Sequence, residues 1–338
     1  MKRTRRIGSH LDVYFSCEEV EYLAMSDLAE SIHNQALSSG FDKCGIIPVS
    51  ALDGFDELYQ KRLIDVPMSQ YFYRGVGKLN ETRERFPWAK SIVILVFDYG
   101  KFRFPKDLQG RYGKAFLLEP EKKSKSRFDL EKLEAWFYEN GIRAEGGEHF
   151  GSGSVGPLRY MAMKAGLGII RKNNFFYTDN GSYNNLYGYV IDKECELIHV
   201  CEIPPCSEKC DLCRRACKTK ALWAPYTMDP FKCVSFLTTF GNSDVPDGLT
   251  DEMYEEWMCG CDNCQDACPY NMRHDWRQGK VLKELEDIAP VILPDNYGAL
   301  TDEFLVRNVI PKTANHLQDK DIPALRKNAA RSAANGKE

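Results

Sequence analysis

The chain lacks the long apolar segments that carry proteins into or across a membrane. No stretch of its 338 residues approaches the ~18 consecutive apolar residues of a membrane span. The basic opening segment, which includes the pair Arg5 and Arg6, is not followed by an apolar run. Secretory and twin-arginine signals both need such a run. We therefore expect no membrane partner and a cytoplasmic location.

The chain also lacks a strong charge bias and a complete dinucleotide-binding motif. Its formal net charge is −4, and it is 28% charged and 43% apolar, values that are ordinary for globular proteins and argue against a whole-surface nucleic-acid binder. Gly151, Gly153 and Gly156 match the G-x-G-x-x-G spacing. The strand–glycine loop–helix context with a downstream acid, which a Rossmann site needs, is not present. A flexible turn and a ligand-contacting loop remain alternative interpretations of this segment.

Helix and strand signals alternate through the first half of the chain without the strict period of a doubly wound sheet. The fold class that they predict is α+β. The predicted helices span residues 16–40, 51–63, 128–140, 158–165 and 322–338, and the predicted strands span residues 41–49, 91–97, 142–150 and 186–191. The continuous apolar run at 91–97, S-I-V-I-L-V-F, is typical of a central strand.

Cysteine is abundant in one region. Nine of the thirteen cysteines lie between Cys206 and Cys268. A disulfide framework is disfavoured, because a chain of this size in a reducing compartment can bury a large core without such staples. Zinc is the stronger alternative, but structural zinc sites usually present C-x2-C pairs that are a dozen or more residues apart.

The spacing of these cysteines favours iron–sulfur clusters over zinc. The segment 210–217 reads C-x2-C-x3-C, and the segment 261–268 repeats this spacing with Pro269 after the last cysteine. Bacterial ferredoxins use the run C-x2-C-x2-C-x3-C-P, whose fourth cysteine binds the other cluster. Two departures are the C-x3-C spacing from Cys206 to Cys210 and Lys218 in place of the first proline.

The ferredoxin rule assigns eight thiolates to two [4Fe-4S] clusters. Cluster 1 takes Cys206, Cys210, Cys213 and Cys268. Cluster 2 takes Cys217, Cys233, Cys261 and Cys264. The remaining cysteines, namely Cys17, Cys44, Cys195, Cys201 and Cys259, are left over, and a free cysteine commonly serves as a small buried apolar residue.

Short sequence motifs spread over much of the chain resemble those of the epoxyqueuosine reductase family. These are the iron–sulfur and cobalamin enzymes of queuosine tRNA modification, and they are related to reductive dehalogenases. The motifs are Gly40-Phe41-Asp42, Arg111-Tyr112, Ala165-Gly166-Leu167-Gly168 with Lys172-Asn173, Gly181-Ser182, Ala224-Pro225-Tyr226, both cysteine runs, Cys268-Pro269-Tyr270-Asn271 and Leu325 to Gly336. The resemblance implies helical repeats after the last of these motifs. This sequence does not contain such repeats, so we expect a divergent and truncated member.

The resemblance carries expectations about organisation and partners. It implies an N-terminal α/β sandwich-like domain with a mixed sheet over residues 1–195, a ferredoxin-like double-cluster domain over 196–285 and a helical tail over 286–338. It also implies cobalamin as a further cofactor, a low-potential electron donor and tRNA as a partner. We expect a monomer. The residues that it implies for cofactor binding are Tyr112, Gly166, Gly168 and Lys172.

The site residues of the family transfer less completely than its clusters. The family acid, an Asp in a D-S-A-P word, aligns with Ser152, and serine at its ordinary pKa is not a comparable proton donor. Glu148 and His149 are the nearby candidates for that role. Arg171 stands where the family has glycine. Two functions therefore remain open: an iron–sulfur reductase that uses a corrinoid, and a divergent electron-transfer protein that has lost the corrinoid chemistry.

Overall fold

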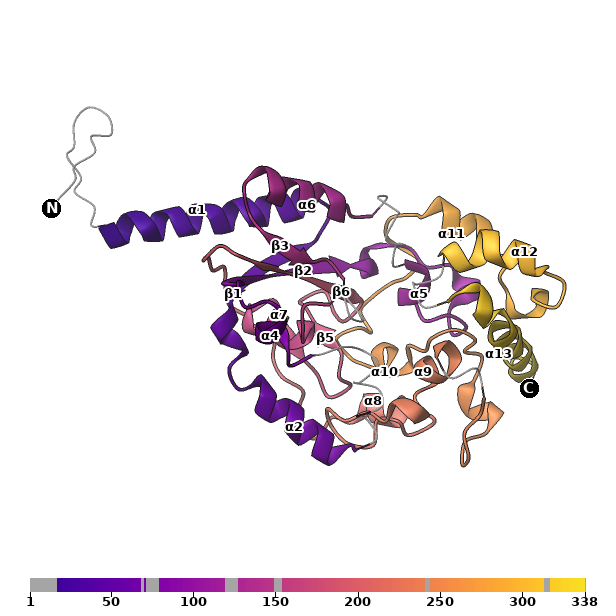
Figure 1. The fold of residues 1–338 in the computed structure, drawn as a ribbon. Helices are drawn as coiled ribbons and strands as arrows, with labels where there is room; N and C mark the ends of the chain where they lie inside the picture. The colour runs from indigo at the N-terminus through magenta and orange to yellow at the C-terminus, as the bar shows by residue number, and fades with distance from the viewer. Residues whose placement is uncertain are drawn as a thin grey trace.

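The computed structural model describes residues 17–67, 70, 79–118, 127–148, 154–240, 244–312 and 317–337. The fold class is α+β, as predicted (Figure 1). His149, a candidate for the catalytic acid, and Ser152, which aligns with the family acid, lie outside the described residues, as do Gly151 and Gly153 of the glycine-rich loop. Among the described residues, no helix is long and apolar enough to cross a membrane.

A four-stranded sheet forms the centre of the N-terminal half, with the strand order β1-β2-β6-β3. The strands are β1 (Lys43–Pro48), β2 (Ser91–Asp98), β3 (Ala144–Gly146) and β6 (Asn184–Ile191). Every neighbouring pair is antiparallel, so the predicted mixed sheet is wrong. The apolar pattern could not reveal this, because a strand buried on both faces has the same pattern in either direction.

Both faces of the sheet are covered, which explains the unbroken apolar run of β2. Val93, Leu95 and Phe97 face the core under α1 (Cys17–Ser38) and α6 (Leu130–Glu139). The alternating residues of β2 face the core under α7 (Leu158–Lys164), and Figure 1 shows the helices on the two sides. Gly188 in β6 permits this packing, because a Cβ there would lie 2.7 Å from a Leu158 methyl carbon.

Most predicted elements are present with shifted ends. The predicted helix 51–63 is α2 (Phe55–Asp65), which follows a 3-10 turn over Val49–Leu52. The predicted strand 142–150 is reduced, in its described part, to β3. A two-stranded hairpin of β4 (Ile169–Ile170) and β5 (Phe176–Tyr177) was not predicted, because each strand has only two residues.

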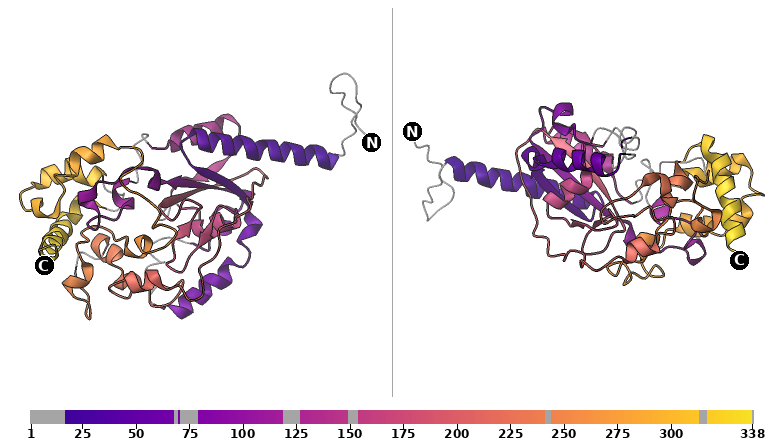
Figure 2. Two further views of the ribbon diagram at one scale, coloured as in Figure 1. Left: turned by 180° about the vertical axis from the view of Figure 1, so that it is seen from behind. Right: turned by 90° about the horizontal axis from the view of Figure 1, so that it is seen from below.

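The described part of the C-terminal half consists of short helices and connecting segments. Its α-helices are α8 (Leu212–Ala216), α9 (Val234–Thr239), α10 (Asn263–Asp266), α11 (Lys283–Ile288), α12 (Asp302–Phe304) and α13 (Ile322–Asn335). Two further short helices, α4 (Thr82–Arg85) and α5 (Ala115–Leu118), belong to the N-terminal half. The helix α13 confirms the predicted helical tail. Figure 2 shows α1 and α13 at opposite ends of the molecule, with the cysteine-rich segment between them.

Candidate iron–sulfur site

Four thiols of the cysteine-rich segment gather in a first group. The pKa of the Cys213 thiol is raised, first because it is buried and then because other thiolates would add negative charge beside it. Those thiols belong to Cys206, Cys210 and Cys268. This group has the same members as predicted cluster 1, and Cys268 joins it from the far cysteine run.

A second group contains the other four predicted ligands. Burial is the largest cause of the raised pKa of Cys264, and the thiols of Cys233 and Cys217 raise it further. Burial also raises the pKa of Cys261, with contributions from Cys264 and Cys233. The Cys213 thiol acts on Cys264 as well, so the two groups adjoin. Their assignment as ligands stays a prediction.

The donor set fits two cubane clusters. All eight thiols are free of disulfide bonds, and thiolate is the ligand that [4Fe-4S] clusters use. Within the described ranges, no three His, Cys, Asp or Glu side chains converge as ligands of a single metal ion. Convergence on one point is not required of a cubane, because each thiolate binds a different iron of the cluster.

Three consecutive residues from the β4–β5 hairpin hold both cysteine runs; we call Arg171, Lys172 and Asn173 the hairpin clamp. The buried Lys172 Nζ donates to the carbonyl oxygens of Ser207, Glu208 and Cys210, at 2.7, 2.9 and 3.0 Å. Asn173 Nδ2 donates to the Cys264 carbonyl oxygen at 3.0 Å. Asn174 closes the hairpin with a φ of 66°, a left-handed conformation that asparagine tolerates.

Arg171 contacts a thiol directly. Its Nη1 donates to Cys206 Sγ at 3.5 Å, and its Nη2 donates to the Pro204 carbonyl oxygen at 2.7 Å. The guanidinium lies 3.5 Å from the ring centre of Tyr270, which follows Cys268 by two residues. The hairpin clamp thus contacts the predicted ligands of cluster 1 through a sulfur atom and through backbone carbonyl groups.

A second support comes from the segment 111–114, which runs beside the segment 258–262. Gly113 N donates to the Cys259 carbonyl oxygen at 2.8 Å. Lys114 is 2% exposed, and its Nζ lies 3.0 Å from Asp262 Oδ2 and 2.9 Å from Asp266 Oδ1. Asp262 lies between Cys261 and Cys264 in the sequence. This buried ion pair therefore fixes the loop that carries two predicted cluster 2 ligands.

The four residues implied for cofactor binding all have protein contacts in this structure. The fully buried Tyr112 hydroxyl lies 2.6 Å from that of Tyr297 and donates to the Ile292 carbonyl oxygen at 2.9 Å. A Cβ at Gly166 or Gly168 would overlap the carbonyl oxygen of His199 or Tyr177, at 1.7 and 2.1 Å. Lys172 belongs to the hairpin clamp. These contacts explain the four residue types without a corrinoid, so a cofactor contact stays an untested prediction.

Cobalamin stays an expectation from the resemblance, because the described residues implied for it are all bonded to or packed against other parts of the protein.

The described acid candidates are Glu148 and one residue that sequence reasoning missed. Glu148 is half-buried and lies two residues after the end of the edge strand β3. Asp98, at the end of β2, has a pKa raised to about 6, chiefly by burial and then by the nearby Asp42 carboxylate. Its Oδ2 accepts a hydrogen bond from Asn180 at 3.1 Å. The strand pattern gave no signal for it, because its pKa depends on tertiary neighbours.

The remaining described cysteines are separate from the two groups. Cys259 is fully buried in the main core, and burial alone raises its pKa to about 12. Cys44 and Cys195 are also buried core residues, while Cys201 is half-buried. The side chain of Cys17 lies outside the described part. Cys259 thus has the surroundings of an apolar core residue.

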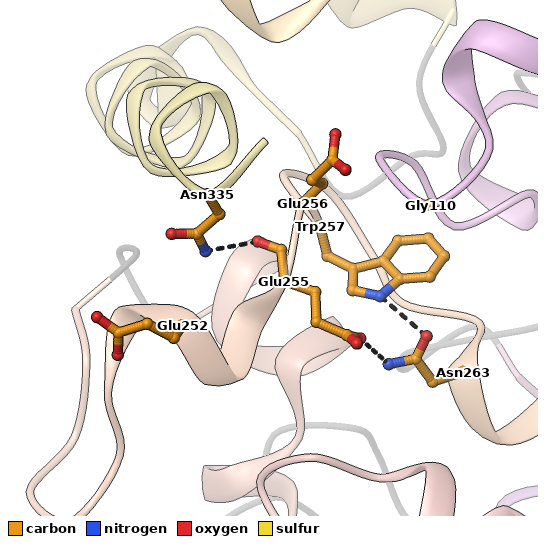
Figure 3. Close-up of a pocket in the computed structure, with 7 residues that line it drawn as sticks. All are labelled: Gly110, Glu252, Glu255, Glu256, Trp257, Asn263 and Asn335. Carbon is orange, nitrogen blue, oxygen red and sulfur yellow. Dashed lines mark hydrogen bonds between the residues drawn. The ribbon is translucent and has the colours of Figure 1, made fainter. Parts of the chain in front are cut away.

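A cavity of about 420 Å³ lies beside the second cysteine run (Figure 3). It is lined by Gly110, Glu252, Glu255, Glu256, Trp257, Asn263 and Asn335. Asn335 Nδ2 donates to the Glu255 carbonyl oxygen at 2.7 Å, and Asn263 Nδ2 donates to the Glu255 carboxylate at 2.5 Å. These bonds join α13 to the segment of Cys261 and Cys264. The glutamates would repel a phosphate, so we assign no substrate to this cavity.

Comparison with known proteins supports the iron–sulfur assignment. Residues 206–271 match the family model of the 4Fe-4S double cluster binding domain. The epoxyqueuosine reductase of Leadbetterella byssophila is 29% identical over 73% of this chain and 81% of its own length. That of Synechocystis is 26% identical over 74% of this chain and 90% of its own length.

The fold agrees with these sequence matches. A crystal structure of epoxyqueuosine reductase with an epoxyqueuosine-modified tRNA-Tyr stem loop superposes with a TM-score of 0.72 at 24% identity. The match covers 93% of this chain and 82% of that one. The agreement thus includes both the sheet and the cysteine-rich segment. In sequence and in fold, this chain is therefore similar to the epoxyqueuosine reductases.

Proposed function

We propose that this chain is an iron–sulfur reductase that removes the epoxide oxygen of epoxyqueuosine in tRNA. The observation that carries the proposal is the gathering of eight free thiols into two adjoining groups of four, held by residues of the N-terminal sheet domain. Two [4Fe-4S] clusters at these groups would pass single electrons inward. The substrate class is taken from similar proteins, which are epoxyqueuosine reductases, one of them crystallised with an epoxyqueuosine-modified tRNA stem loop.

The reaction sets a requirement for electrons and protons. Removing an epoxide oxygen as water consumes two electrons and two protons. A low-potential donor would supply the electrons through the clusters. Asp98 is a candidate proton donor, because an acid with a pKa of about 6 transfers protons efficiently near neutral pH. Asp98 also lies near the second cysteine run: Asn180 bonds to it, and the following residues Gly181 and Ser182 contact Asn271.

A second function is favoured by a specific observation. Tyr112, Gly166, Gly168 and Lys172 all have protein contacts, and the family acid aligns with a serine. An electron-transfer protein that keeps both clusters and lacks the corrinoid reaction would have these properties. We rank it second, because a simple electron carrier does not require the covered four-stranded sheet.

The deciding experiment uses the full chain purified anaerobically and reconstituted with iron and sulfide. It should contain about eight irons. The reduced protein is then incubated with an epoxyqueuosine-modified tRNA stem loop, with and without cobalamin, and the nucleosides are analysed by mass spectrometry. Loss of one oxygen from the base supports the reductase. Eight irons without conversion, and without binding of cobalamin by absorption spectroscopy, support the electron carrier. Zinc in place of iron overturns both.

A further inference from the structure

Arg171 is a buried cation in direct contact with a predicted cluster ligand. The side chain is 2% exposed. Its Nη1 donates to Cys206 Sγ at 3.5 Å, and its Nε has no hydrogen-bond partner among the described residues. Two aromatic rings flank the guanidinium, Tyr270 at 3.5 Å and Tyr177 at 5.1 Å from their ring centres. The side chain is therefore held in one place beside the sulfur.

The charge of Arg171 is not balanced by a carboxylate in the described part of the chain, where its hydrogen-bonding partners are a sulfur and a carbonyl oxygen. A buried charge is costly unless an opposite charge lies beside it. A cubane with four thiolate ligands is an anion, and reduction makes it more negative. Cluster 1 would therefore supply the counter-charge that the guanidinium lacks.

The surroundings of the second thiol group differ. The buried cation there is Lys114, which is paired with the two carboxylates of Asp262 and Asp266. Cys217 Sγ has a neutral contact, the Thr219 hydroxyl at 3.7 Å. Lys218 is paired with Glu255 and is more than half exposed. Arg171 and the neighbouring Lys172, two buried cations without a carboxylate partner among the described residues, thus both lie on the side of cluster 1.

We propose that Arg171 is a positioning residue that raises the reduction potential of cluster 1 above the value it would otherwise have. The inference rests on the proposed iron–sulfur function. A hydrogen bond to a ligand sulfur and a nearby positive charge both stabilise the reduced cluster, which carries more negative charge. An electron that reaches the pair of clusters would then reside preferentially on cluster 1, next to the β4–β5 hairpin.

The test compares Arg171→Met, Arg171→Lys and a control in a redox titration of the anaerobically purified full chain, followed by electron paramagnetic resonance. Arg171→Met should lower one of the two midpoint potentials by about 59 mV, which corresponds to a tenfold change in the one-electron reduction equilibrium constant. Arg171→Lys should lower the same midpoint by less, because it keeps the charge and loses the fixed N–H···S geometry. Cys206→Ser, which changes a cluster 1 ligand, should displace the same midpoint.

Arg215→Met is the matched control. Arg215 lies two residues after Cys213, is 68% exposed and pairs with Asp211, so water and salt screen its charge. It should leave both midpoints unchanged. Absence of iron from the wild-type chain would refute the proposed function itself. About eight irons with unchanged midpoints in both Arg171 variants would overturn the inference alone. Iron loss in both variants would also overturn it, since Arg171 would then serve cluster assembly.

Discussion

The Lys172 ammonium lies 3.0 Å from the carbonyl oxygen of Cys210. This contact joins the N-terminal sheet domain to the loop of the first cysteine run, and the same ammonium binds two further carbonyl groups of that loop. The iron–sulfur site is therefore assembled by residues from both halves of the chain. We therefore expect the stability of this site to depend on the hairpin clamp as well as on the cysteines.

Replacing Lys172 should loosen the loop of cluster 1. Lys172→Met removes three charge-assisted hydrogen bonds and leaves carbonyl groups without their donor, which we expect to cost at least about 2 kcal/mol. Iron should then be lost faster to a chelator, with about half of the total affected. Iron release is followed by absorbance. Lys209→Met is the control, because Lys209 is exposed in the same loop, and equal release rates for the two variants would contradict the role of the hairpin clamp.

The ligand assignment predicts different results for two buried cysteines. Cys233→Ala should reduce the iron content from about eight to about four per chain, because it removes a thiolate of cluster 2. Cys259→Ala should keep about eight, because Cys259 packs in the core among apolar side chains. Iron and sulfide analysis checks both. The reverse pattern would mean that Cys259 is the ligand.

The ion pair of Lys114 should contribute strongly to stability. Lys114→Met leaves the buried Asp262 carboxylate without its counter-charge, and we expect a loss of about 3–5 kcal/mol in the free energy of unfolding. Denaturant unfolding measures it. Lys101→Met is a matched control, since the pair of Lys101 with Asp42 is 34% and 28% exposed and should contribute about 1 kcal/mol or less. Similar losses in both variants would rule out a special role for the buried pair.

The raised pKa of Asp98 predicts that the free energy of unfolding depends on pH. Its pKa is raised from 3.8 to about 6, so the folded chain holds the proton more tightly than the unfolded chain does. Ionisation of Asp98 therefore costs folding free energy: the cost is absent below pH 3.8, grows between 3.8 and about 6, and is complete above that range. Asp98→Asn removes the cost.

We expect Asp98→Asn to be more stable than the wild type at pH 7.5, by about 1–2 kcal/mol after the altered bond to Asn180 is allowed for. The gain should shrink as the pH falls toward 4.5. Thermal unfolding at several pH values measures it. Asp275→Asn is the control, because hydrogen bonds from Arg277 lower the pKa of that half-buried carboxyl. A gain that does not depend on pH would show that Asp98 does not titrate as described.

Much of this protein could be predicted from local patterns. The spacing of the cysteines indicated two clusters and crossed ligands, because a cubane needs several thiolates from one tight loop. Apolar periodicity located β2, β6, α1, α6 and α7, because burial on a strand or helix face leaves a repeat in the sequence. The family resemblance came from short sequence motifs, such as Arg111-Tyr112 and Lys172-Asn173, which the structure brings together around the cysteines.

Other properties depend on contacts between distant residues, and only the tertiary structure decided them. Strand direction was misjudged because both directions give the same apolar pattern. Tyr112 is bonded to Tyr297, 185 positions away, and Asp98 owes its raised pKa to burial and to Asp42. In the sequence, Arg171 was notable only because the epoxyqueuosine reductase family has a glycine at the corresponding position. The folded chain places it against Cys206, where a buried positive charge acts on a sulfur that the linear sequence separates from it by 35 positions.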